Sequence, residues 1–380
     1  MTDTLKLAGR DLFWPPADEL MEAAERIRAR LGDWPPTHVN WRICLTAPDD
    51  ANGGDLIVIA DSPRALQHDG QHVARIARWL TQGAGVIEAA AGRAVLHLGG
   101  VRYQLEGHLP EDWIAALAAF LDCGFDPHDA LVLALAWRDG DETRAADAWP
   151  CDLSRFPRIA GLPDAPAQPF AACPDALGLY AVLPTADWVE RVTGFGVKTV
   201  QLRRKSAQPG ELKEEITRSV AAGREHDAQV FINDHWQAAI DACAYGVHLG
   251  QEDVHTADLH ALAAAGLRLG LSTHGYYEML TALHFRPSYI ALGAVFPTTT
   301  KVMPTAPQGL ARLARYVKLL DGVVPLVAIG GISGEVLPQV LATGVKSAAV
   351  VRAVTEAADP ASAVDALQQA FAQRKIQKSL

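Results

Sequence analysis

The C-terminal half of this 380-residue chain repeats one pattern eight times: a short run rich in β-branched residues, followed by a helix-like stretch. The runs start at residues 178, 199, 229, 246, 268, 289, 324 and 347, so a new strand begins about every 24 residues. Near-continuous apolar strands that alternate with helices are typical of a parallel sheet covered by helices. Eight such units in about 200 residues predict a (β/α)8 TIM barrel near its lower size limit. An open, doubly wound sheet is the alternative, but no GxGxxG follows the first strand.

A proline-rich segment separates this half from the rest of the chain. Residues 151–177 contain five prolines and little hydrophobic periodicity, as linkers do. We therefore expect a smaller N-terminal α/β domain over 1–160, a linker over 161–177 and the barrel domain over 178–380. Within the first domain, residues 113–137 predict a helical hairpin.

Composition excludes several classes of partner. The formal net charge of −10 gives a nucleic-acid partner no electrostatic support. No apolar run reaches the ~18 residues of a membrane span, and the first residues lack the apolar region of a signal peptide. Five scattered cysteines without a C-x-x-C pair indicate neither a metal cluster nor a disulfide framework. We expect a cytoplasmic protein that acts on small molecules, either alone or as a homo-oligomer.

In TIM barrels the chemistry lies where the strands end and the βα-loops begin. The second strand runs into the segment 201–205, which is Gln201, Leu202, Arg203, Arg204 and Lys205. Strand alternation turns the first, third and fifth of these residues to one face and Arg204 to the other. Cations at the open rim of a barrel can hold a diphosphate. A solvated basic turn is the alternative interpretation.

Two acids follow the next two strands. Asp234 comes after Asn233 at the end of the third strand, and Asp253 follows the fourth. Adjacent strands lie about 4.8 Å apart, so these carboxylates can converge, and two close carboxylates repel unless a proton or a cation lies between them. Oxygen ligands favour Mg²⁺, which keeps waters and takes phosphate oxygens from a substrate. The alternative for each acid alone is a helix N-cap.

The fifth and sixth strands end in hydroxyl-rich sequence. Ser272 follows the fifth strand and can donate to phosphate oxygens, with His274 close behind, whereas His248 inside the fourth strand is expected to satisfy a core contact. The sixth strand leads through Pro297 into the segment 298–301, which reads Thr298, Thr299, Thr300 and Lys301. The 35 residues between the starts of the sixth and seventh strands form the longest such interval in the barrel half. Long βα-loops are usually lids, so we expect this one to close over phosphates.

The last two strands predict a second phosphate site. The seventh ends in two glycines, of which Gly331 is the second, and the eighth ends in Val351 and Arg352. Glycines let backbone N–H groups approach a phosphate, and the loops after strands 7 and 8 are the recurrent phosphate site of this fold. Tight-turn glycines are the alternative. Together the strand ends suggest two anionic groups, one held near strands 2–5 with a metal and one near strands 6–8.

These segments, in this order, resemble a known family. VQLRRK, FINDHW, YGVHLGQED, LGLSTH, PSYIALGAVFPTTTK, PQGL and VAIGGIS occur with family-like spacing, and residues 178–360 closely resemble thiamine-phosphate synthase. The resemblance implies condensation of 4-amino-2-methyl-5-(diphosphooxymethyl)pyrimidine with a 4-methyl-5-(2-phosphoethyl)thiazole to give thiamine phosphate and diphosphate. It also implies Mg²⁺-assisted, dissociative loss of diphosphate before the thiazole nitrogen attacks.

The resemblance assigns roles to the strand-end residues. It implies Mg²⁺ ligands at Asp234 and Asp253, and thiazole-phosphate contacts at Thr298 to Thr300, Gly331 and Val351. It further implies pyrimidine-diphosphate contacts at Gln201 to Lys205, Asn233, Ser272 and Lys301, with the catalytic contribution from Arg203, Lys205, Ser272 and Lys301. The family commonly has serine where this chain has Arg352, so that residue must substitute if the serine acts through its hydroxyl.

Alternatives remain for both halves. The barrel could be a thiazole tautomerase, an isomerase or lyase of a phosphorylated metabolite, or a non-catalytic sensor of the thiamine pathway, although the retained acids and flap lysine favour diphosphate departure. Residues 113–137, together with AVLHLGG and AWPCDLSRFP, resemble the C-terminal region of hydroxymethylpyrimidine-phosphate kinases of the ribokinase-like fold. The Gly-Thr-Gly-Cys anion hole of those kinases is missing, so we expect a truncated, non-catalytic remnant that binds a pyrimidine or a partner. An unrelated α/β domain is the alternative.

Overall fold

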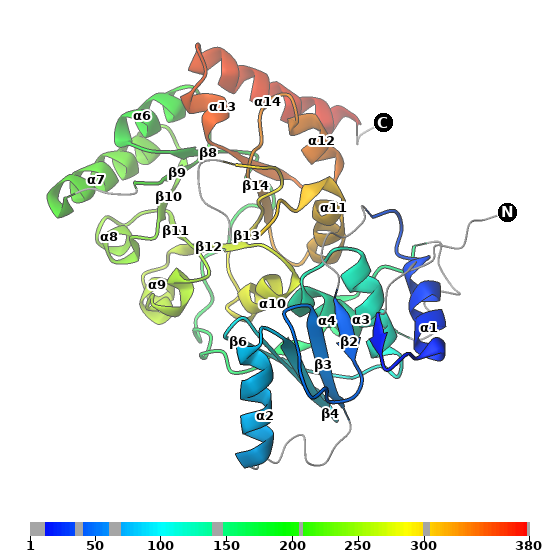
Figure 1. Cartoon of the computed structure of the whole chain (residues 1–380). Helices are drawn as coiled ribbons and strands as arrows, with labels where there is room; N and C mark the ends of the chain where they lie inside the picture. The colour runs from blue at the N-terminus through cyan, green and yellow to red at the C-terminus, as the bar shows by residue number, and fades with distance from the viewer. Residues whose placement is uncertain are drawn as a thin grey trace. The chain divides into compact units, whose positions relative to one another are not determined.

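The computed structural model of the chain describes residues 12–34, 41–60, 70–138, 147–204, 208–298 and 305–377. It divides into two compact units, Met1–Leu162 and Pro163–Leu380. Figure 1 shows a sheet with helices in the first unit and a closed ring of strands in the second. Among the helices so described, none has the length and apolarity needed to cross a membrane.

The first unit is a seven-stranded sheet in the order β1-β2-β3-β4-β5-β6-β7. The first four strands pair in parallel and the remaining pairings are antiparallel. The elements are β1 (Phe13–Trp14), α1 (Asp18–Arg28), β2 (Arg42–Cys44), β3 (Asp55–Ala60), α2 (Gly70–Thr81), β4 (Gly85–Ala90), β5 (Arg93–Leu98), β6 (Val101–Glu106), α3 (Trp113–Asp122), α4 (Pro127–Ala136) and β7 (Arg158–Ile159).

The helical hairpin predicted over 113–137 is present as α3 and α4, which pack against each other. Almost every residue of both helices is buried. A helix that is apolar on all sides must be enclosed by its neighbours, so the hairpin belongs to the core of this unit. The buried guanidinium of Arg28 on α1 binds Asp122 at 2.8 Å, which compensates its charge inside that core.

The second unit is the predicted barrel. Eight parallel strands close in the order β10-β11-β12-β13-β14-β15-β8-β9. The strands are β8 (Leu179–Leu183), β9 (Thr199–Leu202), β10 (Gln229–Asn233), β11 (Gly246–Leu249), β12 (Arg268–Thr273), β13 (Tyr289–Leu292), β14 (Leu326–Ile329) and β15 (Ser347–Val350). The α-helices between and after them are α6 (Ala186–Gly194), α7 (Pro209–Glu225), α8 (Trp236–Asp241), α9 (Leu259–Ala264), α10 (Tyr276–His284), α11 (Gly309–Leu320), α12 (Leu337–Ala342), α13 (Arg352–Thr355) and α14 (Pro360–Gln377).

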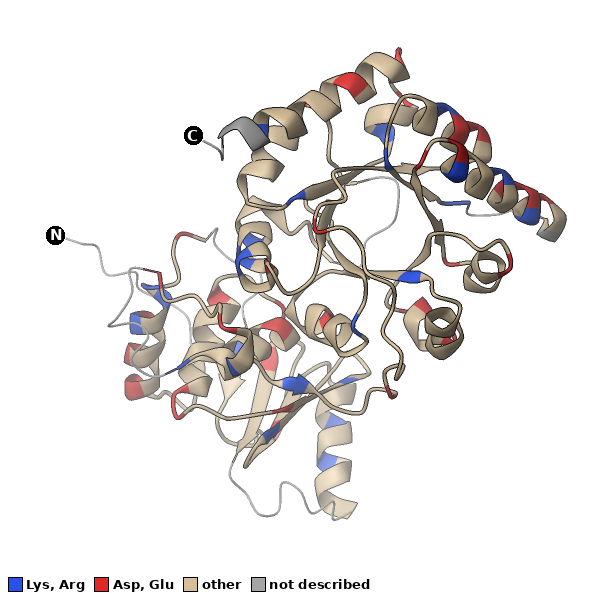
Figure 2. Cartoon of the chain, turned by 180° about the vertical axis from the view of Figure 1, so that it is seen from behind, with Lys and Arg blue, Asp and Glu red and all other residues tan. Residues whose placement is uncertain are grey.

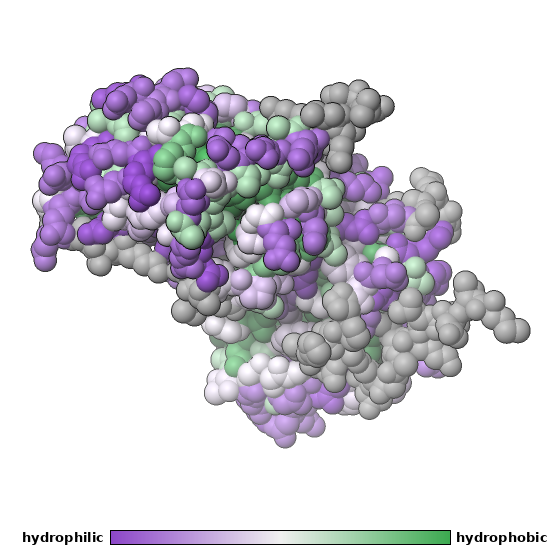
Figure 3. Space-filling model, turned by 90° about the horizontal axis from the view of Figure 1, so that it is seen from above, coloured by the Kyte–Doolittle hydropathy of each residue, from purple (hydrophilic) through white to green (hydrophobic). Residues whose placement is uncertain are grey.

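Charge and polarity follow this architecture. Figure 2 looks into the ring of strands, which is mostly uncharged, while Lys, Arg, Asp and Glu concentrate on the surrounding helices. The surface formed by α6 and α7 is correspondingly hydrophilic in Figure 3. Burial on one side and hydration on the other is what holds such helices against a barrel.

Large and small side chains fill the barrel interior in alternation. Phe231 and Tyr289 are fully buried in its core. A Cβ placed on Gly246 would lie 2.6 Å from the Phe231 ring, and one placed on Gly270 would lie 2.2 Å from the Tyr289 ring. Glycine on β11 and on β12 therefore makes room for the aromatic side chains of β10 and β13.

Most of the segment expected to be a linker, 161–177, falls within the second compact unit, which begins at Pro163. The backbone carbonyls of residues 163–177 accept hydrogen bonds from side chains near the start of barrel strands. Arg268 Nε donates to the carbonyl of Ala172 at 2.9 Å, and Ser288 Oγ donates to that of Ala171 at 2.7 Å. A proline-rich segment has few N–H groups for regular structure, but its carbonyls can still accept these bonds.

Ser288→Ala is expected to lower the free energy of unfolding of the barrel unit by about 1–3 kcal/mol. The Ser288 hydroxyl also accepts from the amide of Leu269 at 2.9 Å, so the change leaves two backbone groups unpaired. Thr217→Ala is the control, since the hydroxyl of Thr217 bonds Lys213 on an exposed helix face. Urea denaturation measures both, and equal midpoints for the two variants would contradict the role given to residues 163–177.

Candidate active site

A cavity of about 780 Å³ lies at the carboxyl ends of the barrel strands. Residues from all eight barrel strands, β8 through β15, and from the loops that follow them contribute to its wall. Those that the sequence singled out and that line it are Gln201, Arg203, Asn233, Asp234, Asp253, Ser272, Thr298, Gly331, Val351 and Arg352. Side chains separated by 151 positions in the chain thus face one space.

Strand alternation decides which residues of the basic segment reach the cavity. Gln201 and Arg203 line it, while Leu202 and Arg204 do not. The amide of Arg203 donates to the carbonyl of Leu183 at 2.8 Å, which continues the pairing of β9 with β8. Lys205, Thr299, Thr300 and Lys301 lie outside the described residues.

The acidic side of the cavity holds two carboxylates in proximity. Reduced hydration raises the pKa of Asp234, and the negative charge of Asp253 raises it further, against the opposing charge of Arg203. Asp234 is held in the left-handed region at φ 61°, and its amide donates to the carbonyl of His248 at 3.0 Å. Strained backbone of this kind persists where the surroundings fix it, and it commonly marks functional sites.

These carboxylates suit a hard divalent cation, although they supply only part of its coordination shell. Asp253 is oriented by the amide of Gly250, which donates to its Oδ2 at 3.3 Å. In the part of the chain that the structure describes, no group of three or more His, Cys, Asp or Glu side chains could hold a metal. Mg²⁺ accepts one or two carboxylates and completes its shell with water and substrate phosphate oxygens, so the donor set fits that ion.

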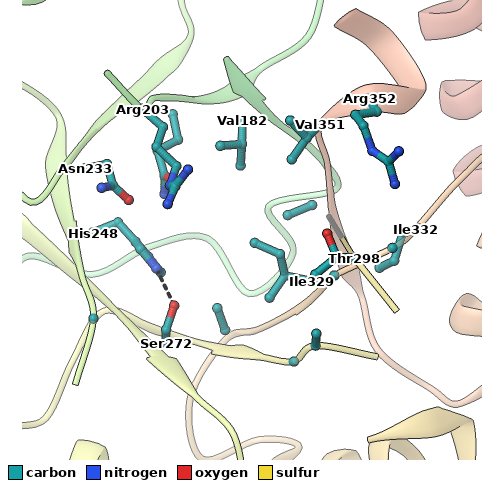
Figure 4. Close-up of a pocket in the computed structure, with 18 of the residues that line it drawn as sticks. Val182, Arg203, Asn233, His248, Ser272, Thr298, Ile329, Ile332, Val351 and Arg352 are labelled. Carbon is teal, nitrogen blue, oxygen red and sulfur yellow. Dashed lines mark hydrogen bonds between the residues drawn. The ribbon is translucent and has the colours of Figure 1, made fainter. Parts of the chain in front are cut away.

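A third part of the wall is held by hydrogen bonds between side chains. His248 on β11 lies with its Nε2 2.8 Å from Ser272 Oγ on β12, the contact drawn in Figure 4. Its Nδ1 lies 2.7 Å from the hydroxyl of Tyr289, which is fully buried. His248 was expected to satisfy a core contact; it does so, and it also lines the cavity.

The far side of the cavity is built from the glycine turn after β14 and the start of α13. Figure 4 shows Thr298, Val351 and Arg352 together on this side, away from Arg203 and His248. The amide of Phe296 donates to the carbonyl of Gly330 at 3.0 Å, so the loop after β13 packs on the glycine turn. This pairing places Thr298, the first residue of the hydroxyl-rich segment 298–301, beside that turn.

Sequence reasoning missed several residues of the wall. Glu252, Ser333 and Glu356 line the cavity, and none was singled out. His274, which received no assigned role, also lines the cavity, and its Nδ1 lies 2.7 Å from the Glu278 carboxylate one helical turn away. Glu278 at this spacing was the only signal that could have indicated the orientation of His274.

Comparison with known proteins shows which family the sequence of the barrel unit resembles. A family model described as thiamine monophosphate synthase matches residues 179–354. The thiamine-phosphate synthase of Neisseria meningitidis serogroup A is 62% identical over 192 residues, which are 50% of this chain and 93% of the relative. That of Salmonella newport is 56% identical over 197 residues, which are 52% and 90% of the two chains.

The chain belongs to the thiamine-phosphate synthase family. A solved structure of thiamine phosphate pyrophosphorylase from Pyrococcus furiosus is 32% identical, with a TM-score of 0.46, and covers 52% of this chain and 96% of its own. The family model lies wholly within the barrel unit, as the residues that carried the resemblance do. The cavity is therefore the candidate active site of a family member.

Proposed function

We propose that the barrel unit condenses 4-amino-2-methyl-5-(diphosphooxymethyl)pyrimidine with a 4-methyl-5-(2-phosphoethyl)thiazole, which yields thiamine phosphate and diphosphate. One observation carries this proposal: a single cavity joins a carboxylate pair and Arg203 on one side with the glycine turn and Arg352 on the other. Two separate anion-binding regions match a reaction with one diphosphate and one monophosphate substrate. A nucleophilic side chain is not required, because the bond to diphosphate breaks before the thiazole attacks.

The residues on the diphosphate side have complementary tasks. Arg203 presents a planar cation that can bind phosphate oxygens bidentately, and Ser272 presents a hydroxyl. Lys205 and Lys301 are proposed from the resemblance to add two further cations, from segments outside the described residues. Preorganised cations aimed at the departing group stabilise the charge that develops on it as the carbon–oxygen bond breaks.

Asp234 and Asp253 are proposed to hold Mg²⁺ at this side. When bound, the ion would neutralise charge on the departing diphosphate. The raised pKa of Asp234 supports this assignment, because two close carboxylates share a proton when no cation is present. Asn233, nine-tenths buried beside them, is proposed to contact the pyrimidine substrate.

The proposal is tested by supplying both substrates to the purified chain, with Mg²⁺ or with a chelator, and measuring diphosphate and thiamine phosphate. We expect equimolar products that depend on the divalent ion. No release of diphosphate would contradict the proposal and would leave a sensor or an isomerase as the alternative. Conversion of a thiazole tautomer in the same preparation, without diphosphate release, would favour a tautomerase.

Arg352→Ser is expected to raise the KM for the thiazole phosphate about tenfold and to leave the KM for the pyrimidine diphosphate within about twofold, because one charge-assisted contact contributes that much. Arg352 is exposed toward the cavity at the start of α13, on the side of the glycine turn. Arg315→Ser on α11, which does not line the cavity, is the control. Steady-state kinetics measure both constants. Equal changes in the two KM values would contradict the assignment of Arg352 to the monophosphate site.

The N-terminal unit is proposed to be a non-catalytic remnant that binds a pyrimidine or a partner. Its mixed sheet and the α3–α4 hairpin support a relationship to a ribokinase-like domain, while the sequence lacks the glycine-rich anion hole of such kinases. ATP and hydroxymethylpyrimidine phosphate are therefore expected to give no ADP with the full chain. ADP formation above a no-enzyme control would contradict this proposal.

A further inference from the structure

A chain of buried hydrogen bonds connects two walls of the cavity through the barrel core. Gln201 Nε2 donates to the hydroxyl of Tyr180 at 3.2 Å, and this hydroxyl lies 2.8 Å from that of Tyr289. The Tyr289 hydroxyl lies 2.7 Å from His248 Nδ1, and His248 Nε2 lies 2.8 Å from Ser272 Oγ. Gln201 on β9 and Ser272 on β12 line the cavity, whereas the two tyrosines do not.

Each of the two tyrosines in this series of hydrogen bonds has one hydroxyl hydrogen to donate. Tyr180 is 1% exposed and Tyr289 is fully buried. Burial raises the pKa of both phenols above the ordinary value, so both stay protonated at neutral pH. A phenol donates once, and a neutral imidazole donates through one nitrogen and accepts through the other. The direction of one bond therefore fixes the direction of the next.

The amide of Gln201 sets that direction. An NH₂ group cannot accept, so the hydrogen of Tyr180 must go to Tyr289, and the hydrogen of Tyr289 must go to His248 Nδ1. Neutral His248 then carries its hydrogen on Nε2 and donates to Ser272 Oγ. Two groups remain for a ligand: the Oε1 of Gln201, which accepts, and the hydroxyl hydrogen of Ser272, which donates. Reversing the direction of these hydrogen bonds would require rotating the Gln201 amide. The donor and acceptor groups offered at both walls would then change together.

We propose that Tyr180, Tyr289 and His248 are positioning residues that fix this donor and acceptor pattern and so determine which heterocycle the cavity accepts. The inference rests on the proposed function. A 4-aminopyrimidine offers an exocyclic N–H and a ring-nitrogen lone pair, which match one acceptor and one donor. Its 4-oxo analogue offers a carbonyl and a ring N–H at the same edge, so it leaves buried polar groups unpaired, and sites of this kind reject such analogues strongly.

The test measures discrimination rather than activity. The dissociation constants of the 4-amino and 4-oxo pyrimidine diphosphates are determined by calorimetry, with Mg²⁺ and without the thiazole, for the full chain and for Tyr289→Phe. Phenylalanine keeps the ring that fills the space beside Gly270 and removes only the hydroxyl. We expect the preference for the 4-amino compound to fall about tenfold or more, since the Gln201 and Ser272 ends can then reorient independently.

Tyr316→Phe is the matched control. Tyr316 is 2% exposed, its hydroxyl donates to Gln308 Oε1 at 2.8 Å, and it does not line the cavity. This variant should keep the wild-type preference. An unchanged preference in Tyr289→Phe, or an equal loss for both compounds, would overturn the inference while leaving diphosphate release by the wild type, and thus the proposed function, unaffected.

Two further measurements keep the inference testable if Tyr289→Phe does not fold. Tyr180→Phe interrupts the chain one bond earlier and should reduce the preference in the same way. In the wild type, ¹⁵N NMR of the imidazoles should show His248 as the neutral tautomer with its proton on Nε2, with the signal assigned by its loss in His248→Gln. A proton on Nδ1 would reverse the deduced direction and overturn the inference.

Discussion

Asp234→Asn is expected to lower diphosphate release by a factor on the order of 10² to 10³ and, at the same time, to make the metal-free protein more heat-stable. The activity falls because one of the two carboxylates proposed to hold Mg²⁺ loses its charge. The stability rises because the charge of Asp253 no longer faces a second carboxylate. Asparagine tolerates the left-handed backbone at φ 61°, so the change is confined to the charge.

The sign of the pH dependence separates this effect from general stabilisation. A carboxyl whose pKa is raised on folding binds its proton more tightly in the folded state, so its contribution to stability is fully present below the unfolded value of about 3.9. That contribution is lost as the pH rises through the folded pKa. The melting temperatures of Asp234→Asn and wild type should therefore be similar near pH 4 and diverge toward neutral pH.

Asp227→Asn is the control for this experiment. Asp227 also has a left-handed backbone, at φ 49°, and an exposed carboxylate, but it does not line the cavity. Its substitution should leave diphosphate release unchanged and should not reproduce the gain in melting temperature expected for Asp234→Asn. Wild-type activity in Asp234→Asn at saturating Mg²⁺ would exclude this carboxylate from the metal site.

Gly331→Ala is expected to raise the KM for the thiazole phosphate about a hundredfold and to lower the melting temperature. Gly331 has φ 66°, a conformation that costs other residues about 1–2 kcal/mol. A Cβ there would lie 2.6 Å from the carbonyl oxygen of Pro297 and 2.7 Å from Cβ of Phe296. The loop that carries Thr298 would have to move away from the glycine turn, which separates the two parts of the proposed monophosphate site.

Gly266→Ala distinguishes the close approach from the backbone conformation. Gly266 has a similar φ of 72°, but a Cβ added there would meet nothing within 4 Å. This control should lose stability through strain alone and keep the wild-type KM. Steady-state kinetics and thermal melting of both variants provide the comparison, and matching KM values would show that the contact of Gly331 with Pro297 does not shape the site.

Local sequence determined much of this protein. Eight alternating apolar runs predicted the barrel, because burial on both faces of a parallel strand leaves a continuous apolar pattern. The period of two along β9 predicted that Gln201 and Arg203 share one face, and both line the cavity, whereas Arg204 does not. Strand ends of a closed barrel meet at one rim, so residues from Gln201 to Arg352 could be assigned to one cavity from the pattern alone.

Only the tertiary structure decided what depends on closure of the ring. His248 and Tyr289 are 41 positions apart and lie on different strands, so no local pattern predicts that their side chains join Gln201 to Ser272. Residues 163–177 carry the composition of a linker, yet they belong to the barrel unit because distant side chains donate to their carbonyls. Periodicity fixes which face a side chain takes, whereas hydrogen bonds between distant strands arise only when the fold brings those faces together.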